Sequence, residues 1–167
     1  MKKLKIRAAQ NASAKYLRLP VLRALLASLW LVLLAGTISS AHASSPLYII
    51  VNVANPATEF SRKDVIGLYM GRIHAFANGD RVVTLDLPRE SETRVRFYKL
   101  LTGMSPAQIN TYWARLIFTG QTSAPQPQAD ETAMLEGVRH NPAAIGYLSS
   151  TPASSDVRVV FVLDDGP

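Results

Sequence analysis

The chain has 167 residues, and none of them is a cysteine. Disulfide bonds, thiol nucleophiles and zinc–thiolate sites are therefore excluded. The glycine-rich loops of nucleotide-binding proteins and the G-x-S-x-G turn of serine hydrolases are absent as well. We accordingly expect a protein that is not an enzyme and that carries no cofactor.

Histidines are few, and their positions do not favour a metal site. Of the three, His42 lies near the N-terminus, His74 follows one expected helix and His140 ends another. Two distant histidines without a matching pattern of carboxylates are a poor set of metal ligands. We therefore expect no metal.

Acidic residues are missing from the first 43 residues, which hold seven of the 18 Lys and Arg. A basic stretch up to Arg23 is followed by an apolar run from residue 24 to about residue 38, and then by Ala41-His42-Ala43. This order is typical of a secretory signal peptide with small residues at the two positions that the peptidase reads. We predict that residues 1–43 are a signal peptide, cleaved between Ala43 and Ser44, and that the remainder is periplasmic.

The apolar run is too short to span a bilayer comfortably, because it has about 15 residues where about 20 are needed. An uncleaved membrane anchor is the alternative, and the unusual length of the basic stretch leaves it open. Removal of residues 1–43 leaves 11 basic against 12 acidic residues, a formal net charge of −1. No basic surface for nucleic acid survives, so no nucleic-acid partner is expected.

Residues 44–167 suffice for one domain with its own core. β-branched and apolar runs predict strands, and polar caps followed by apolar residues at helical spacing predict helices. The expected strands are 47–53, 81–87, 143–149 and 157–163, the expected helices begin after Ser61, Ser91 and Ser105 and at about Asp130, and 119–129 is expected to be a loop. This alternation predicts an α/β fold. We expect the first strand, the helix after it and the second strand to form a βαβ-like unit, within a mixed sheet.

The helix that begins at Pro106 carries the most regular apolar stripe of the chain. Its members recur at i, i+3, i+4, i+7 and i+8 and are Ile109, Tyr112, Trp113, Leu116 and Ile117. Such a stripe is typical of a helix face that packs on a core. We predict that it supports the stability of the domain, and that Tyr112 and Trp113 are core residues rather than a carbohydrate-stacking pair.

Several short segments, taken in order, resemble one lobe of the phosphate-binding proteins that feed ABC transporters, in the type II periplasmic binding protein superfamily. They are residues 60–72, Ala77-Asn78-Gly79-Asp80, residues 88–93, Tyr112-Trp113, Phe118-Thr119-Gly120 and residues 141–147. The resemblance implies a three-layer αβα arrangement with a mixed sheet. It also implies that residues 44–167 are a single lobe, where the family has two lobes that close on an anion.

The turn before the second expected helix is where the resemblance implies ligand contacts. In the family this turn carries an arginine, a serine, a glycine and a threonine, and the matching residues here are Arg89, Ser91 and Thr93. The sequence departs from the pattern because the glycine is missing and Glu90 and Glu92 add negative charge. The alternative is that Ser91 is only a helix cap with Glu92 favourably placed in the first turn. Arg94 and Arg96 are expected to be solvated or paired with these glutamates.

Two functions follow from this resemblance. One is an exported, non-enzymatic phosphate- or anion-binding-like protein, serving as the substrate-binding component of an ABC transporter or as a sensor. A single lobe leaves the anion half in water, so we expect a Kd of about 1 mM or weaker. The alternative is a degenerate lobe that acts as a periplasmic protein-interaction module without a ligand. The candidate partners are a transporter subunit, a membrane receptor or a second copy of the chain. A homodimer of two copies would rebuild a two-sided cleft.

Overall fold

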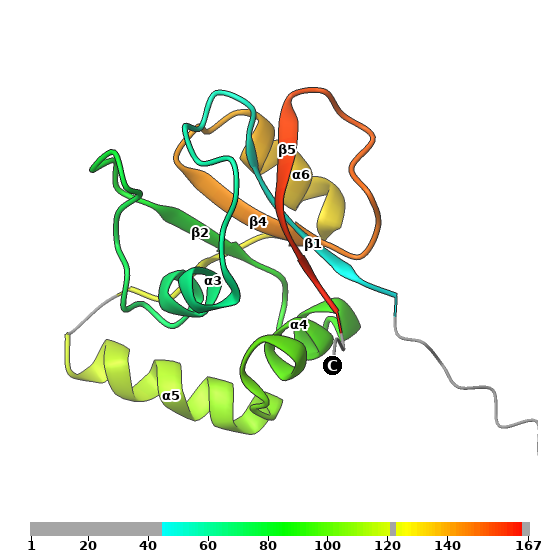
Figure 1. Cartoon of the computed structure of the whole chain (residues 1–167). Helices are drawn as coiled ribbons and strands as arrows, with labels where there is room; N and C mark the ends of the chain where they lie inside the picture. The colour runs from blue at the N-terminus through cyan, green and yellow to red at the C-terminus, as the bar shows by residue number, and fades with distance from the viewer. Residues whose placement is uncertain (1–44, 121–122, 165–167) are drawn as a thin grey trace, which may run out of the picture. The chain divides into compact units, whose positions relative to one another are not determined.

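A five-stranded mixed sheet organises residues 45–120 and 123–164, which the computed structural model describes (Figure 1). The strands are β1 (Leu47–Asn52), β2 (Val83–Asp86), β3 (Gln126–Pro127), β4 (Ala144–Leu148) and β5 (Val157–Leu163). Their order across the sheet is β3-β2-β4-β1-β5. β1 pairs antiparallel with β4 and β5, whereas β2 pairs parallel with β3 and β4. The predicted mixed sheet is confirmed, while the predicted signal peptide and its cleavage site lie outside the described residues.

The four described helices begin where the sequence places a polar cap. They are α3 (Arg62–Tyr69), α4 (Glu92–Thr102), α5 (Pro106–Phe118) and α6 (Glu131–Arg139), with Ser61, Ser91, Ser105 and Asp130 as their N-caps. Each cap side chain accepts a hydrogen bond from a backbone amide of the first turn, which satisfies a donor that the helix itself cannot pair. α4 ends at Gly103, whose φ of 74° lies in the left-handed region that glycine adopts freely.

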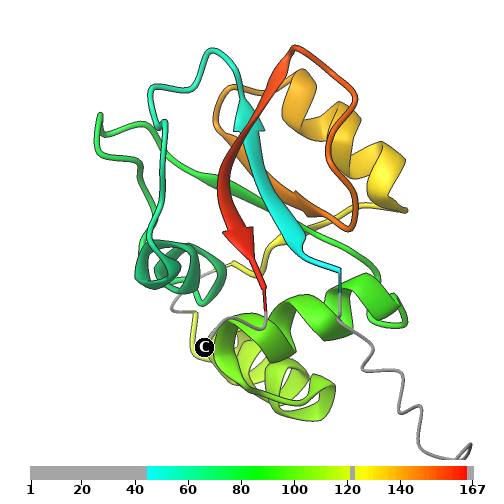
Figure 2. The same cartoon turned by 45° about the vertical axis from the view of Figure 1, so that its right-hand side comes forward.

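The helices cover both faces of the sheet (Figures 1 and 2). α6 packs on β4 and β1, and Gly146 allows this contact because a Cβ there would lie 2.9 Å from Met134 Cγ. On the opposite face, Tyr147 stacks on Phe97 of α4, and Tyr69 of α3 packs edge-on against the same two rings. The result is the predicted α/β arrangement of three layers.

Two of the predictions about connections are wrong. β1, α3 and β2 do not form a βαβ unit, because β4 lies between β1 and β2 and pairs with them in opposite directions. The expected loop over 119–129 contains the short edge strand β3, which pairs with the end of β2 at Leu85 and Asp86. Both errors concern pairing between segments that are distant in the sequence, which a local pattern does not specify.

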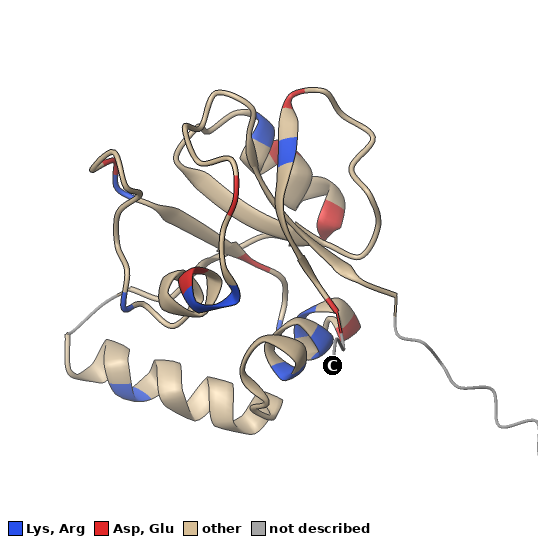
Figure 3. Ribbon diagram, viewed as in Figure 1, with Lys and Arg blue, Asp and Glu red and all other residues tan. Residues whose placement is uncertain are grey.

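Helix α5 lies beside α4 at the bottom of the view in Figure 1, and it is less buried than its apolar stripe predicts. Ile109 and Trp113 are buried, whereas Tyr112 and Leu116 are half-buried and Ile117 is 54% exposed. Phe118 at the end of the helix is 93% exposed. Arg115 is the one charged residue of α5, so its outer surface is mostly uncharged (Figure 3). Among the described helices, none has the length and apolar character of a membrane span.

Candidate functional site

The turn between β2 and α4 holds the three residues that the sequence assigns to an anion. Ser91 is the N-cap of α4, and its hydroxyl oxygen accepts a hydrogen bond from the amide of Arg94 at 3.4 Å. The Ser91 carbonyl accepts another from the amide of Val95 at 3.0 Å. The amides of Glu92 and Thr93 precede these two and cannot be paired within the helix. Ser91 is therefore a cap, and the start of α4 keeps two amides that can meet an anion.

Thr93 faces away from this turn, toward the start of α6. Its hydroxyl donates to Glu131 Oε1 at 2.7 Å, and Glu131 Oε2 accepts from the amide and hydroxyl of Ser149 at 2.8 and 2.9 Å. Three donors thus converge on one carboxylate of the chain itself. The Thr93 hydroxyl can bind an external anion only after this bond breaks, so its amide is the group open to a ligand.

Arg89 is exposed at the tip of the turn, where the Ser91 amide donates to the Pro88 carbonyl at 3.0 Å. It lines a cavity of about 300 Å³ together with Arg94. The structure therefore brings Arg89, Ser91 and Thr93 to one helix start but directs the two hydroxyls to protein partners. Their binding of an anion remains a prediction.

Arg94 differs most from its expected place. It is only 5% exposed, and its Nε donates to Asp86 Oδ2 at 2.8 Å. The expectation that it is solvated or paired with Glu90 and Glu92 is wrong, because the first turn of α4 directs it inward to the end of β2. Arg96 is half-buried and donates to the carbonyl of Ser45.

Asp86 is the centre of a buried polar cluster that the sequence analysis did not identify. Its Oδ1 accepts from the Tyr147 hydroxyl at 2.6 Å and the Leu87 amide at 3.0 Å. Its Oδ2 accepts from Arg94 at 2.8 Å and the Tyr98 hydroxyl at 3.0 Å. Four hydrogen bonds use the acceptor capacity of an ionised carboxylate. The available signal was a charged residue between two leucines, Leu85 and Leu87, at the end of a predicted strand, since both faces of this sheet are covered.

Burial and the Asp86 charge set the protonation of this cluster. Burial raises the pKa of Tyr98 and Tyr147 well above the ordinary tyrosine range, and the nearby carboxylate raises it further. Burial alone would lower the pKa of Arg94, but the charge and hydrogen bond of Asp86 raise it. The indole N–H of Trp113 lies beside the Tyr98 hydroxyl and opposes the rise of its pKa, at a geometry that falls short of a hydrogen bond. The tyrosines are therefore neutral donors rather than bases.

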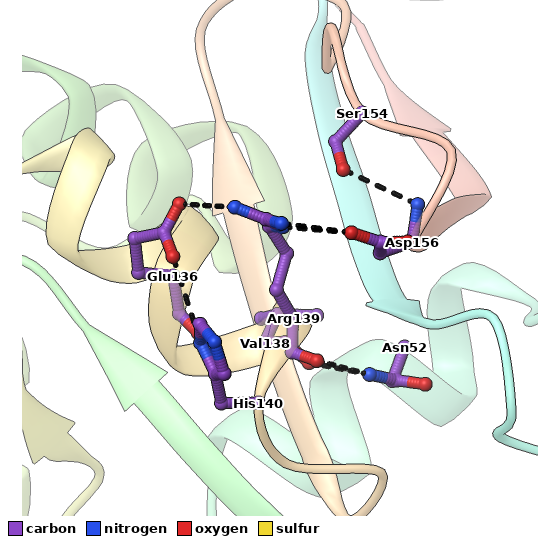
Figure 4. Close-up of polar contacts among 7 residues, drawn as sticks. All are labelled: Asn52, Glu136, Val138, Arg139, His140, Ser154 and Asp156. Carbon is purple, nitrogen blue, oxygen red and sulfur yellow. Dashed lines mark hydrogen bonds and ion pairs between the residues drawn. The ribbon is translucent and has the colours of Figure 1, made fainter.

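A second polar cluster lies at the C-terminal end of α6 and has a structural role (Figure 4). Arg139 pairs with Asp156 at 2.8 Å and with Glu136 at 2.7 Å. The Asn52 side chain donates to the carbonyls of Val138 and Arg139 at 3.1 and 2.7 Å, which caps the helix end. These contacts tie β1, α6 and the segment before β5 together. In the described part of the chain, no group of three or more His, Asp or Glu is placed to hold a metal ion.

Comparison with known proteins identifies the fold. No protein-family model matches the chain, and no curated protein matches it. The chain is similar to an ABC-type phosphate transport receptor from Vibrio cholerae, with a TM-score of 0.53 and 21% identity over 71% of this chain and 47% of that chain. It is also similar to a protein from Clostridium perfringens described as a putative phosphate ABC transporter substrate-binding protein with bound phosphate, with a TM-score of 0.56 and 18% identity over 71% and 46% of the two chains.

A third solved structure, a possible phosphate binding protein from Planctomyces limnophilus, matches with a TM-score of 0.52 and 13% identity, over 71% of this chain and 42% of that one. The chain therefore spans less than half the length of each of these proteins. At such identities the likeness establishes the fold. It confirms at this level the resemblance to phosphate-binding proteins that the sequence suggests.

Proposed function

We propose that the chain is an exported, non-enzymatic lobe that binds a phosphate-like oxyanion weakly at the start of α4. The observation that carries this proposal is an exposed arginine, Arg89, in the turn that leads directly into the unpaired first-turn amides of Glu92 and Thr93. A helix N-terminus combines unpaired amides with a favourable dipole and suits an anion. The fold supports the choice of ligand, because a solved protein of the same fold is described with bound phosphate.

Weak affinity follows from the same geometry. Arg89, Glu90 and Glu92 are all exposed, so water screens the attraction of the arginine and the repulsion of the glutamates alike. The Thr93 hydroxyl is engaged by Glu131 and does not add a free donor. We expect a Kd of about 1 mM or weaker for the single lobe, equivalent to about −4 kcal/mol.

Calorimetric titration with phosphate and sulfate tests this proposal. Arg89→Ala should weaken binding, whereas Arg115→Ala, which removes an exposed arginine from α5, should leave it unchanged. Micromolar binding by the monomer would contradict the half-site. Unchanged phosphate binding by the Arg89→Ala protein would contradict the assignment of Arg89.

The exposed end of α5 favours the second candidate function, an interaction module. Phe118 and Ile117 place two large apolar side chains on a surface where Arg115 is the one charge of the helix. Exposed apolar patches of this kind are typical of protein contacts. A transporter subunit, a membrane receptor or a second copy would fit. Sedimentation with and without phosphate separates the cases, because phosphate-linked dimerisation favours a shared anion site and a phosphate-indifferent monomer favours a different protein partner.

A further inference from the structure

A groove of about 300 Å³ lies between α5, the turn after β2 and the segment that enters β3. Its lining includes the side chains of Arg94, Asn110, Trp113, Ala114, Ile117 and Pro125. We propose that this groove binds a small organic carboxylate with an apolar body, whose carboxylate is held by the terminal nitrogens of Arg94. This site is separate in chemistry from the phosphate half-site proposed above.

The guanidinium of Arg94 is held in place and only partly used. Its Nε donates to Asp86 Oδ2 at 2.8 Å, and its Cζ lies 4.9 Å from the centre of the Tyr98 ring. Neither terminal nitrogen has a hydrogen-bond partner among the described residues. The terminal nitrogens also have some access to solvent. In the described chain, the fully buried side-chain nitrogens without a hydrogen-bond partner are Arg96 Nε and Trp113 Nε1, and the terminal nitrogens of Arg94 are not among them. Arg94 is only 5% exposed, and the groove is the space that it lines. We therefore infer that its terminal nitrogens face the groove.

The terminal nitrogens of an arginine match a carboxylate in planar, two-point geometry. Asp86 does not compete with a ligand for the terminal nitrogens of Arg94. It accepts a hydrogen bond from Nε of this arginine, and its two oxygens accept four hydrogen bonds in total. The Asp86 and Arg94 charges cancel, and Arg89 at the rim adds one positive charge to the lining. The site is therefore suited to a monoanion. The half-buried Asn110 amide supplies a further polar group in the groove.

The walls of the groove distinguish an organic acid from inorganic phosphate. Trp113, Ala114 and Pro125 are apolar surfaces that a fully polar ion cannot cover favourably. An apolar body attached to the carboxylate would bury them and gain hydrophobic free energy. The volume lies at the lower end of the range of small-molecule sites, which begins at about 300 Å³, so the ligand must be small.

Phenylacetate is a suitable probe, with inorganic phosphate as the competitor. In the full chain carrying Trp30→Phe, Trp113 is the only tryptophan and reports directly from the groove. We expect saturable quenching or shift of Trp113 fluorescence by phenylacetate, and a shift of the Arg94 Nε–H resonance in NMR spectra. Phosphate at the same concentration should not displace it.

A substitution that fills the groove tests the proposal while leaving the buried Asp86–Arg94 ion pair intact. Ala114 is exposed and lines the groove, so Ala114→Trp should weaken phenylacetate binding by about tenfold or more, which is about 1.4 kcal/mol. Binding by this variant and its control is measured by the shift of the Arg94 Nε–H resonance, because the added tryptophan would contribute its own fluorescence. Ala107→Trp, at an exposed position of the same helix outside the groove, is the matched control and should bind like the parent. Arg89→Ala should weaken phenylacetate binding by about fivefold at most, because an exposed charge contributes little.

The proposal is overturned if phenylacetate changes neither signal at saturating concentration, or if Ala114→Trp and the parent bind it equally. It is also overturned if phosphate displaces phenylacetate with equal strength, since the groove would then have no preference for an apolar body. Failure of the phosphate half-site gives a different result: calorimetric phosphate binding would be absent or insensitive to Arg89→Ala while phenylacetate still binds.

Discussion

At the scale of single residues, the most consequential contact of this domain is the buried pair of Asp86 and Arg94. Side-chain exposure is 8% for Asp86 and 7% for Arg94, and the carboxylate is shared with two tyrosine hydroxyls and one amide. A buried charge is tolerated only when its partners remain in place. The pair therefore fixes the start of α4 against the end of β2, next to both proposed binding sites.

Removal of Arg94 should be costly because it leaves the Asp86 charge buried without a counter-ion. We expect Arg94→Leu to lower the free energy of unfolding by about 3–5 kcal/mol. The double variant Asp86→Leu, Arg94→Leu should recover part of this loss. Arg89→Ala, at an exposed position, should change stability by about 0.5 kcal/mol or less. Urea denaturation of the four proteins measures these values, and a loss for Arg89→Ala equal to that for Arg94→Leu would reverse the two roles.

The buried tyrosines predict a loss of stability at high pH. Burial and the Asp86 charge raise the pKa of Tyr69, Tyr98 and Tyr147 above the ordinary value of 10.0. In the folded state these groups keep a proton that the unfolded chain releases above pH 10.0, so their contribution to stability is complete below that pH and falls as the pH rises through it. The fall should approach about 1.4 kcal/mol per pH unit for each tyrosine.

Denaturation curves measured between about pH 8 and 11 test this slope, with the window set by the ordinary tyrosine pKa. Tyr98→Phe removes one titrating group and should make the slope shallower. The prediction is wrong if the free energy of unfolding stays constant above pH 10.0, the ordinary tyrosine pKa. These hydroxyls would then ionise as readily in the folded protein as in the unfolded chain.

At the scale of elements, α5 shows how far an apolar pattern can predict packing. The pattern indicates a helix and its bounds, because Ser105 and Gln108 form a capping box and Pro106 occupies the first turn. It does not indicate what the stripe faces. α5 packs on α4 outside the sheet, so Ile109 and Trp113 reach the core while Ile117 borders the groove instead.

Two members of the stripe, Trp113 and Ile117, should therefore differ in how much they contribute to stability. Trp113 is 6% exposed, and Trp113→Ala should cost about 3–5 kcal/mol. Ile117 is 54% exposed, and Ile117→Ala should cost about 1 kcal/mol or less. Thermal and urea denaturation of both variants measure the difference. Equal losses would mean that Ile117 is covered in solution, as expected if α5 forms a protein interface.

At the scale of the whole molecule, the sequence predicts elements well and their pairing poorly. Caps at Ser61, Ser91, Ser105 and Asp130 mark the helix starts because capping is a local interaction. The insertion of β4 between β1 and β2 depends on contacts across about half the chain, and no local signal encodes it. The same division applies to the site. The turn of Arg89 and Ser91 is visible in the sequence, whereas the Asp86–Arg94 pair needs a strand and a helix to meet in space.

The position of the domain relative to the cell membrane gives the last prediction, and it depends on residues 1–43. If this segment is a cleaved signal peptide, the mature protein in the periplasmic fraction should have an intact mass that begins at Ser44. Small side chains at the first and third residues of Ala41-His42-Ala43 are what the peptidase requires, and the middle position is free to vary. Ala43→Leu should therefore block processing, whereas His42→Leu, a change of similar bulk one residue earlier, should be processed normally. Mass spectrometry and fractionation of the three proteins decide the matter. Full-length protein retained in the membrane fraction, with no difference among them, would instead establish an uncleaved anchor that holds the lobe at the membrane surface.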